Sequence, residues 1–77
     1  MKDQFFEKLR EILEAEDKEI SLDDKFRDYE EWDSLANLSL IATIDDEYGV
    51  VIPNDEFKKI ETVGALIQAI ETRMASL

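Results

Sequence analysis

The sequence contains neither cysteine nor histidine. The first absence excludes disulfides and thiolate zinc sites, so neither can supplement the small core of a 77-residue chain. The two absences together remove the usual general base, the usual nucleophile and the commonest transition-metal ligands. We therefore expect a protein that is not an enzyme and that holds no metal ion.

Basic residues are scarce, with 9 Lys and Arg against 20 Asp and Glu and a net charge of −11. Binding to nucleic acid is excluded, because phosphates require a basic face. The negative electrostatic field of the chain attracts cationic protein surfaces, although an acidic surface can also serve solubility alone. Long apolar runs are absent too, and Met1-Lys2-Asp3-Gln4 does not resemble a secretion signal. We expect a cytoplasmic protein that does not enter membranes.

Repeats, low-complexity tracts and linkers rich in proline or glycine are also missing, which favours one domain over residues 1–77. Apolar residues form 44% of the chain and recur at helical spacing, so the chain is not disordered. The first helix is expected over residues 2–15, with an apolar stripe formed by Phe5, Phe6, Leu9, Ile12 and Leu13. Residues 16–33 lose this period and predict a long loop, anchored by Ile20, Leu22, Phe26, Tyr29 and Trp32.

The segment 34–48 predicts the strongest helix, and it carries two apolar stripes. One contains Leu40, Ile41, Ile44 and Tyr48; the other contains Leu35, Leu38 and Ala42. The second stripe either packs inside the domain or stays exposed to receive other proteins. Gly49 is expected to end this helix in a left-handed conformation.

Two further helices are expected after Pro53. Pro53 and Asn54 predict a turn and a cap before a short helical piece that runs through Phe57 and Ile60. Thr62 is expected to cap the last helix, whose core positions are Val63, Leu66, Ile67, Ile70 and Met74. The predicted fold is all-α: a small four-helix bundle of three longer helices and a short third one, with a long loop between the first two.

The run Trp32-Asp33-Ser34-Leu35 marks the start of the second long helix. Asp and Ser are preferred at helix starts, because their side-chain oxygens accept hydrogen bonds from the free amides of the first turn. At the other end, Asp45-Asp46-Glu47-Tyr48-Gly49 fails as a calcium loop, since Ile44 and Tyr48 would occupy ligand positions. The same acids do not suit paired-carboxylate catalysis, because consecutive helical residues splay around the axis.

Taken together, the helices, the anchored loop, the acidity and the serine at the head of the second helix resemble the acyl carrier protein family. The resemblance covers nearly the whole chain and includes Lys25-Phe26, Trp32-Asp33-Ser34-Leu35, Ile52-Pro53 and Ile60-Glu61-Thr62-Val63. It implies that Ser34 is esterified with 4′-phosphopantetheine from coenzyme A, whose thiol carries an acyl group as a thioester. It also implies that a separate phosphopantetheinyl transferase supplies magnesium and coenzyme A and contacts Asp33.

The resemblance assigns further roles to surface and core residues. The carrier would be a monomer, and the enzymes that load and process its cargo would bind it with their own basic patches. The carrier residues that they would contact are Leu35, Leu38, Ala42, Asp45, Asp46 and Glu56. The core, and a cleft for a short acyl chain, would be lined by Leu9, Ile12, Leu40, Ile44, Tyr48, Ile60, Val63, Ile67 and Ile70.

The sequence departs from the fatty-acid-synthesis pattern in one region, since no charged residue lies between Asp33 and Asp45. Charge complementarity governs partner choice, so we expect a carrier dedicated to a specialised biosynthetic pathway. Two alternatives stay open. One is an aminoacyl or peptidyl carrier, and the other is an unmodified acidic helical adaptor that binds a basic protein.

Overall fold

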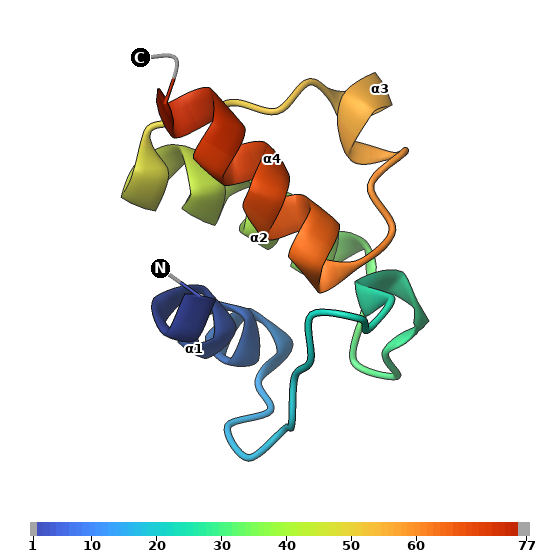
Figure 1. Ribbon diagram of the computed structural model, residues 1–77. Helices are drawn as coiled ribbons and strands as arrows, with labels where there is room; N and C mark the ends of the chain where they lie inside the picture. Colours follow the sequence, from blue (N-terminus) through green and yellow to red (C-terminus); the bar gives the residue numbers. More distant parts are fainter. Residues whose placement is uncertain (1, 76–77) are drawn as a thin grey trace.

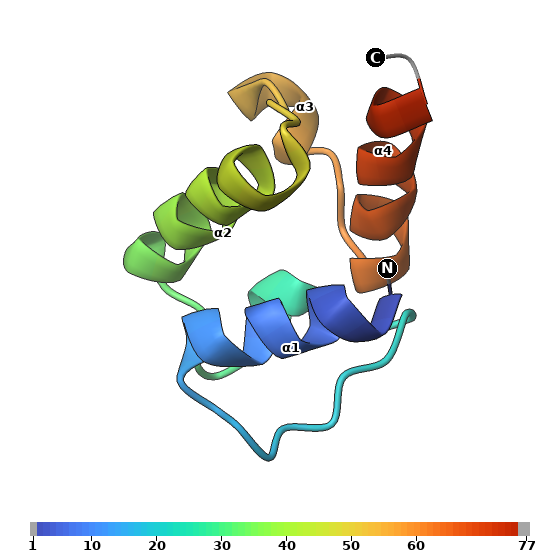
Figure 2. The ribbon, with the colours of Figure 1, turned by 90° about the vertical axis from the view of Figure 1, so that its left-hand side faces the viewer.

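The computed structural model describes residues 2–75, which form four α-helices and one short 3-10 helix. The α-helices are α1 (Lys2–Leu13), α2 (Ser34–Tyr48), α3 (Asn54–Phe57) and α4 (Val63–Ala75). The 3-10 helix η1 (Phe26–Asp28) interrupts the long loop before α2. In both Figure 1 and Figure 2, α1 lies below α2 and α4, and α3 lies in the upper part of the view. The all-α, four-helix prediction is confirmed.

The helices pack around a core of three fully buried phenylalanines, Phe5, Phe26 and Phe57. The ring of Phe26 lies 5.9 Å from that of Phe57 and 5.2 Å from that of Trp32, between centroids. Aromatic pairs at such separations stabilise beyond the area they bury. Among the predicted core residues, Leu9, Leu40, Ile44, Val63, Ile67 and Ile70 are buried, whereas Ile12, Tyr48 and Ile60 are half-buried.

Helix α1 ends two residues earlier than predicted, at Leu13. Glu14 adopts a left-handed conformation (φ 55°) and its N–H donates to the Glu11 carbonyl, while the Ala15 N–H donates to the Arg10 carbonyl. These two bonds form a Schellman motif, which usually places glycine at the left-handed position. Because glutamate stands there instead, the sequence carries no signal for this ending.

Three other local predictions are wrong. Met74 is 42% exposed, because it lies in the last turn of α4 beyond Ile70, the last residue of that helix in the core. Leu22 is 41% exposed and anchors the loop through its backbone, since its carbonyl accepts a 2.8 Å bond from the Gly64 N–H. Asn54 does not cap α3 but is its first residue, preceded by Pro53, which makes no side-chain bond.

Other helix-boundary predictions are confirmed. Gly49 ends α2 with φ 65° and donates its N–H to the Asp45 carbonyl. The Thr62 hydroxyl accepts a 3.1 Å hydrogen bond from the Ala65 N–H at the start of α4. The end of α3 is an exception, since the sequence predicted a helical piece through Ile60 and the helix ends at Phe57. It stops there because the chain turns tightly, and the Ile60 N–H donates to the Phe57 carbonyl. These ends fix the loop connecting α2 to α4.

Candidate functional site

Ser34 is the first residue of α2, and its side chain is exposed. The helix begins there because Asp33 adopts an extended conformation and its carboxylate accepts a 2.8 Å hydrogen bond from the Ala36 N–H. Aspartate thus satisfies one of the open amides at the N-terminus. Since Asp33 provides the cap, the Ser34 hydroxyl is not needed for it. The helix start is where the sequence predicted it.

The two apolar stripes of α2 face different environments. Leu35 and Leu38 are 71% and 65% exposed, and Ala42 is also exposed. On the other side, Leu40 and Ile44 are buried. The interpretation that the second stripe stays exposed is confirmed. Ala36 is also buried, one turn before Leu40, and its place in the core was missed because alanine gives only a weak apolar signal.

The acidic residues predicted for docking divide into two groups. Asp45 and Asp46 are exposed at the C-terminal end of α2, near Ala42 along the same helix. Glu56 lies on α3 and forms an ion pair with Arg73 of α4. The structure therefore aligns Asp45 and Asp46 with the apolar stripe, while Glu56 stands on another element with a cation beside it.

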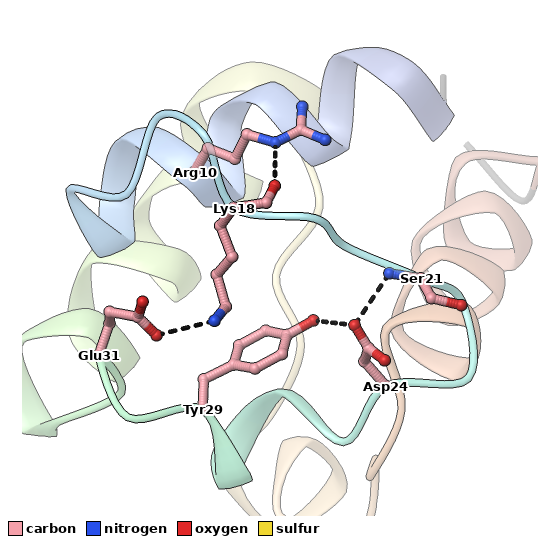
Figure 3. A network of polar contacts seen from close by, with 6 residues as sticks. All are labelled: Arg10, Lys18, Ser21, Asp24, Tyr29 and Glu31. Atoms are coloured by element: carbon pink, nitrogen blue, oxygen red, sulfur yellow. Dashed lines mark hydrogen bonds and ion pairs between the residues drawn. The ribbon is translucent and has the colours of Figure 1, made fainter.

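A network of polar contacts holds the loop that leads to Ser34 (Figure 3). The Asp24 carboxylate accepts hydrogen bonds from the Tyr29 hydroxyl at 2.7 Å and the Ser21 N–H at 2.9 Å. These donors lower the pKa of Asp24. Burial, with the hydrogen bond to Asp24 second, raises the pKa of Tyr29. Both groups therefore keep their donor and acceptor forms at neutral pH.

Lys18 joins this loop to α1 and to the residues just before α2 (Figure 3). Its ammonium forms a 3.0 Å ion pair with Glu31 and lies 4.4 Å above the Tyr29 ring. Its carbonyl accepts a 2.8 Å hydrogen bond from Nε of Arg10 on α1. The hydrogen bond from Lys18 lowers the pKa of Glu31. The long loop is thus tied down three residues before Ser34.

A surface hollow of about 540 Å³ opens beside the serine. Its lining consists of Arg27, Trp32, Asp33, Ser34, Asn37 and Leu38. The hollow is open to solvent, and its lining offers one cation, one carboxylate, a serine hydroxyl, an amide and two apolar side chains. Sequence reasoning did not assign Arg27 any role.

Two further observations bear on the predicted site. Within residues 2–75, no helix has the length and apolar character needed to cross a bilayer. None of the residues predicted to line an acyl cleft borders the hollow beside Ser34. The acyl cleft stays a prediction.

Comparison with known proteins identifies the family. The family model described as "Phosphopantetheine attachment site" matches residues 3–70. The acyl carrier protein of Petrotoga mobilis is 34% identical over 77 residues, which cover 95% of this chain and 91% of the relative. That of Rickettsia rickettsii is 38% identical over 69 residues, covering 90% of this chain and 80% of the relative. No solved structure gives a significant match.

The match spans most of the chain and nearly the full length of the relatives. It therefore includes α2, α3 and the loop before α2, and it reaches into α1 and α4. It also establishes the cofactor, a covalently attached 4′-phosphopantetheine that carries acyl groups as thioesters. Carriers of this kind bring the cargo to other enzymes and are not themselves catalysts. The chain belongs to the acyl carrier protein family, whose members depend on phosphopantetheine.

Proposed function

We propose that Ser34 is the residue that bears the 4′-phosphopantetheine arm. The observation that carries the proposal is the exposed hydroxyl of Ser34 at the first residue of α2, inside the segment matched by the family model. Asp33 already caps the helix, so the hydroxyl is free for modification. A phosphodiester at this end of a helix is stabilised by about 0.3 to 1 kcal/mol through the helix dipole.

Attachment requires a separate enzyme. The chain has no histidine or cysteine that could activate Ser34. A phosphopantetheinyl transferase would supply coenzyme A, magnesium and the base, and Asp33 is exposed beside Ser34 where that enzyme must approach. When bound, the arm supplies the thiol that the chain lacks. The carrier contributes the serine and the surface around it.

The proposed docking surface runs along the exposed side of α2. Leu35 and Leu38 are the apolar anchors, Ala42 leaves room for a partner, and Asp45 and Asp46 meet basic side chains. Glu56 belongs to the proposed surface as a separate acidic residue on α3, where its carboxylate is paired with Arg73 of α4. Large exposed apolar side chains beside charges are typical of interaction sites. Loading and processing enzymes with basic patches would bind here.

The distribution of charge on α2 supports a dedicated pathway. No charged residue lies between Asp33 and Asp45. Partner enzymes would therefore contact the half of α2 next to the arm through apolar side chains. Enzymes that recognise a carrier by acidic residues in the first turn of this helix would find no electrostatic attraction there. We propose acyl cargo in a specialised biosynthesis, with aminoacyl cargo as the alternative. The carrier would act as a cytoplasmic monomer, and sedimentation should give the mass of a single chain, 9.0 kDa.

The decisive experiment is intact mass after incubation with coenzyme A and a broad-specificity phosphopantetheinyl transferase. The wild-type chain should gain the mass of one phosphopantetheine, and Ser34→Ala should gain none. Ser39→Ala is the matched control, because Ser39 lies on the same helix and should not affect the gain. No gain in the wild type would support the unmodified adaptor instead. If Ser34→Ala still gained this mass, the arm would be attached to another residue and the assignment would be wrong.

A further inference from the structure

Arg27, in the 3-10 helix before α2, is held by contacts with residues more than 25 positions away. Its Nη1 donates to the Ile60 carbonyl and its Nη2 donates to the Phe57 carbonyl, at the end of α3. The guanidinium carbon lies 4.8 Å from the Phe26 ring centroid and 5.0 Å from that of Phe57. A guanidinium has five N–H donors, so two carbonyls leave the larger part of its donor capacity unused.

Arg27 has no carboxylate partner in the described part of the chain, although the sequence contains 20 acids. The ion pairs among residues 2–75 join Lys8 to Glu47, Lys18 to Glu31 and Arg73 to Glu56. Carbonyl oxygens and aromatic rings orient a guanidinium but do not neutralise its charge. The full positive charge of Arg27 is therefore available to an anion.

The position of Arg27 indicates which anion. Arg27 and Ser34 line the same hollow, with Asn37 as a further donor and Trp32 and Leu38 as apolar walls. Asp33 is the one carboxylate in that lining, and its acceptor capacity is partly used by the Ala36 N–H. A phosphodiester attached to Ser34 would be the nearest added anion. Guanidinium groups match phosphate oxygens in geometry and bind them through charge-assisted hydrogen bonds.

We propose that Arg27 is the positioning residue for the prosthetic arm: its remaining N–H groups hold the phosphodiester on Ser34 in the hollow that the two residues share. The inference rests on the proposed attachment at Ser34. Held in this way, the first part of the arm leaves α2 on the side of η1 and α3. Since η1 is fixed to the end of α3, the position of α3 is coupled to the direction of the arm.

A thermodynamic cycle tests this role. Folding stability is measured by urea denaturation for the apo and holo forms of wild type, Arg27→Gln and Arg27→Lys. Loss of the contacts with Phe57 and Ile60 destabilises apo and holo Arg27→Gln equally, so it cancels in the cycle. The arm adds negative charge to a chain of net charge −11. Attaching the arm changes the ratio of folded to unfolded protein. In Arg27→Gln this ratio should fall by a factor about two to five times larger than in wild type, because the bond between Arg27 and the phosphodiester is missing.

Two controls make the cycle specific. Lys25→Gln removes one positive charge from the same loop, at an exposed residue outside the lining of the hollow. The change in its folding stability when the arm is attached should match that of wild type, because a general charge effect is screened at moderate salt. Arg27→Lys keeps the charge without the fork geometry and should recover part of the loss. The proposal is wrong if wild type and Arg27→Gln change equally on modification.

A direct readout covers the case in which Arg27→Gln does not fold. In wild type, the Nε–H signal of Arg27 in ¹H–¹⁵N spectra should shift when the arm is attached, whereas those of Arg10 and Arg73 should not. An unshifted Arg27 signal in protein shown by mass to be holo would overturn the proposal while leaving attachment at Ser34 intact. Failure to become holo at all would contradict the proposed function instead.

Discussion

Leu38 and Leu40 lie two residues apart on α2 and have opposite environments, since Leu38 is 65% exposed and Leu40 is completely buried. An exposed leucine contributes almost nothing to the folding free energy of the isolated domain, whereas a buried leucine contributes roughly 1.5 to 3 kcal/mol. The exposed residue shares the hollow with Ser34, and the buried one lies in the core. We propose that this division separates partner recognition from folding within a single helix.

Leu38→Ala should therefore change the free energy of unfolding by less than about 1 kcal/mol, as exposed substitutions usually do. It should slow phosphopantetheinylation, because an apolar anchor acts chiefly at the interface that it fills. Leu40→Ala is the matched control and should cost about 2 to 5 kcal/mol. Urea denaturation and the rate of mass gain measure the two effects. Equal destabilisation of both variants would contradict the docking role.

Gly64→Ala should destabilise the fold by about 1 to 3 kcal/mol, as other overpacking substitutions do. A Cβ at Gly64 would lie 3.0 Å from the Leu22 carbonyl oxygen and 3.3 Å from the Leu22 Cβ, across a backbone hydrogen bond of 2.8 Å. Thermal or urea denaturation gives the value. Alanine is the better helix former by about 1 kcal/mol, so a stabilised variant would mean that the loop moves aside freely.

The carboxylate of Asp24 should stabilise the fold in a pH-dependent manner. Its pKa is lowered in the folded state, first by the Tyr29 hydroxyl and then by the Ser21 N–H. Its contribution is therefore fully present above the ordinary pKa of aspartate, about 3.9, and disappears as pH falls through the lower folded-state value.

Unfolding of wild type and Asp24→Asn at pH 7 and at pH 3 tests this dependence. The stability gap between the two proteins should be larger at pH 7. Asp23→Asn, at the exposed neighbouring residue, is the control and should show no such change. A gap that widens at pH 3 would show that the neutral acid is the stabilising form.

Added salt should raise the melting temperature. A net charge of −11 on 77 residues produces self-repulsion, whereas exposed ion pairs such as Lys8 with Glu47 contribute little. Raising the salt from about 10 mM to about 150 mM shortens the Debye length from roughly 30 to 8 Å and screens the repulsion. The same salt should weaken binding to partner enzymes. A lower melting temperature at higher salt would show that attractive pairs dominate.

The sequence alone predicted the features that depend on neighbouring residues. Helical spacing predicted α2 and α4, Gly49 predicted where α2 ends, and Asp33 with Ser34 predicted where it begins. These predictions succeeded because periodicity, capping and left-handed glycine depend on a few consecutive residues. The same local pattern resembles that of carrier proteins, which led to the correct family.

Tertiary structure decided whatever depends on residues far apart in the chain. The sequence left open whether Leu35 and Leu38 pack inside the domain, because a helical stripe does not reveal how many neighbours surround it. Local signals were also silent on the ending of α1 at Glu14, where glycine is missing. Arg27 owes its position to carbonyls 30 and 33 residues away, and such contacts exist only after α3 and the loop have packed together.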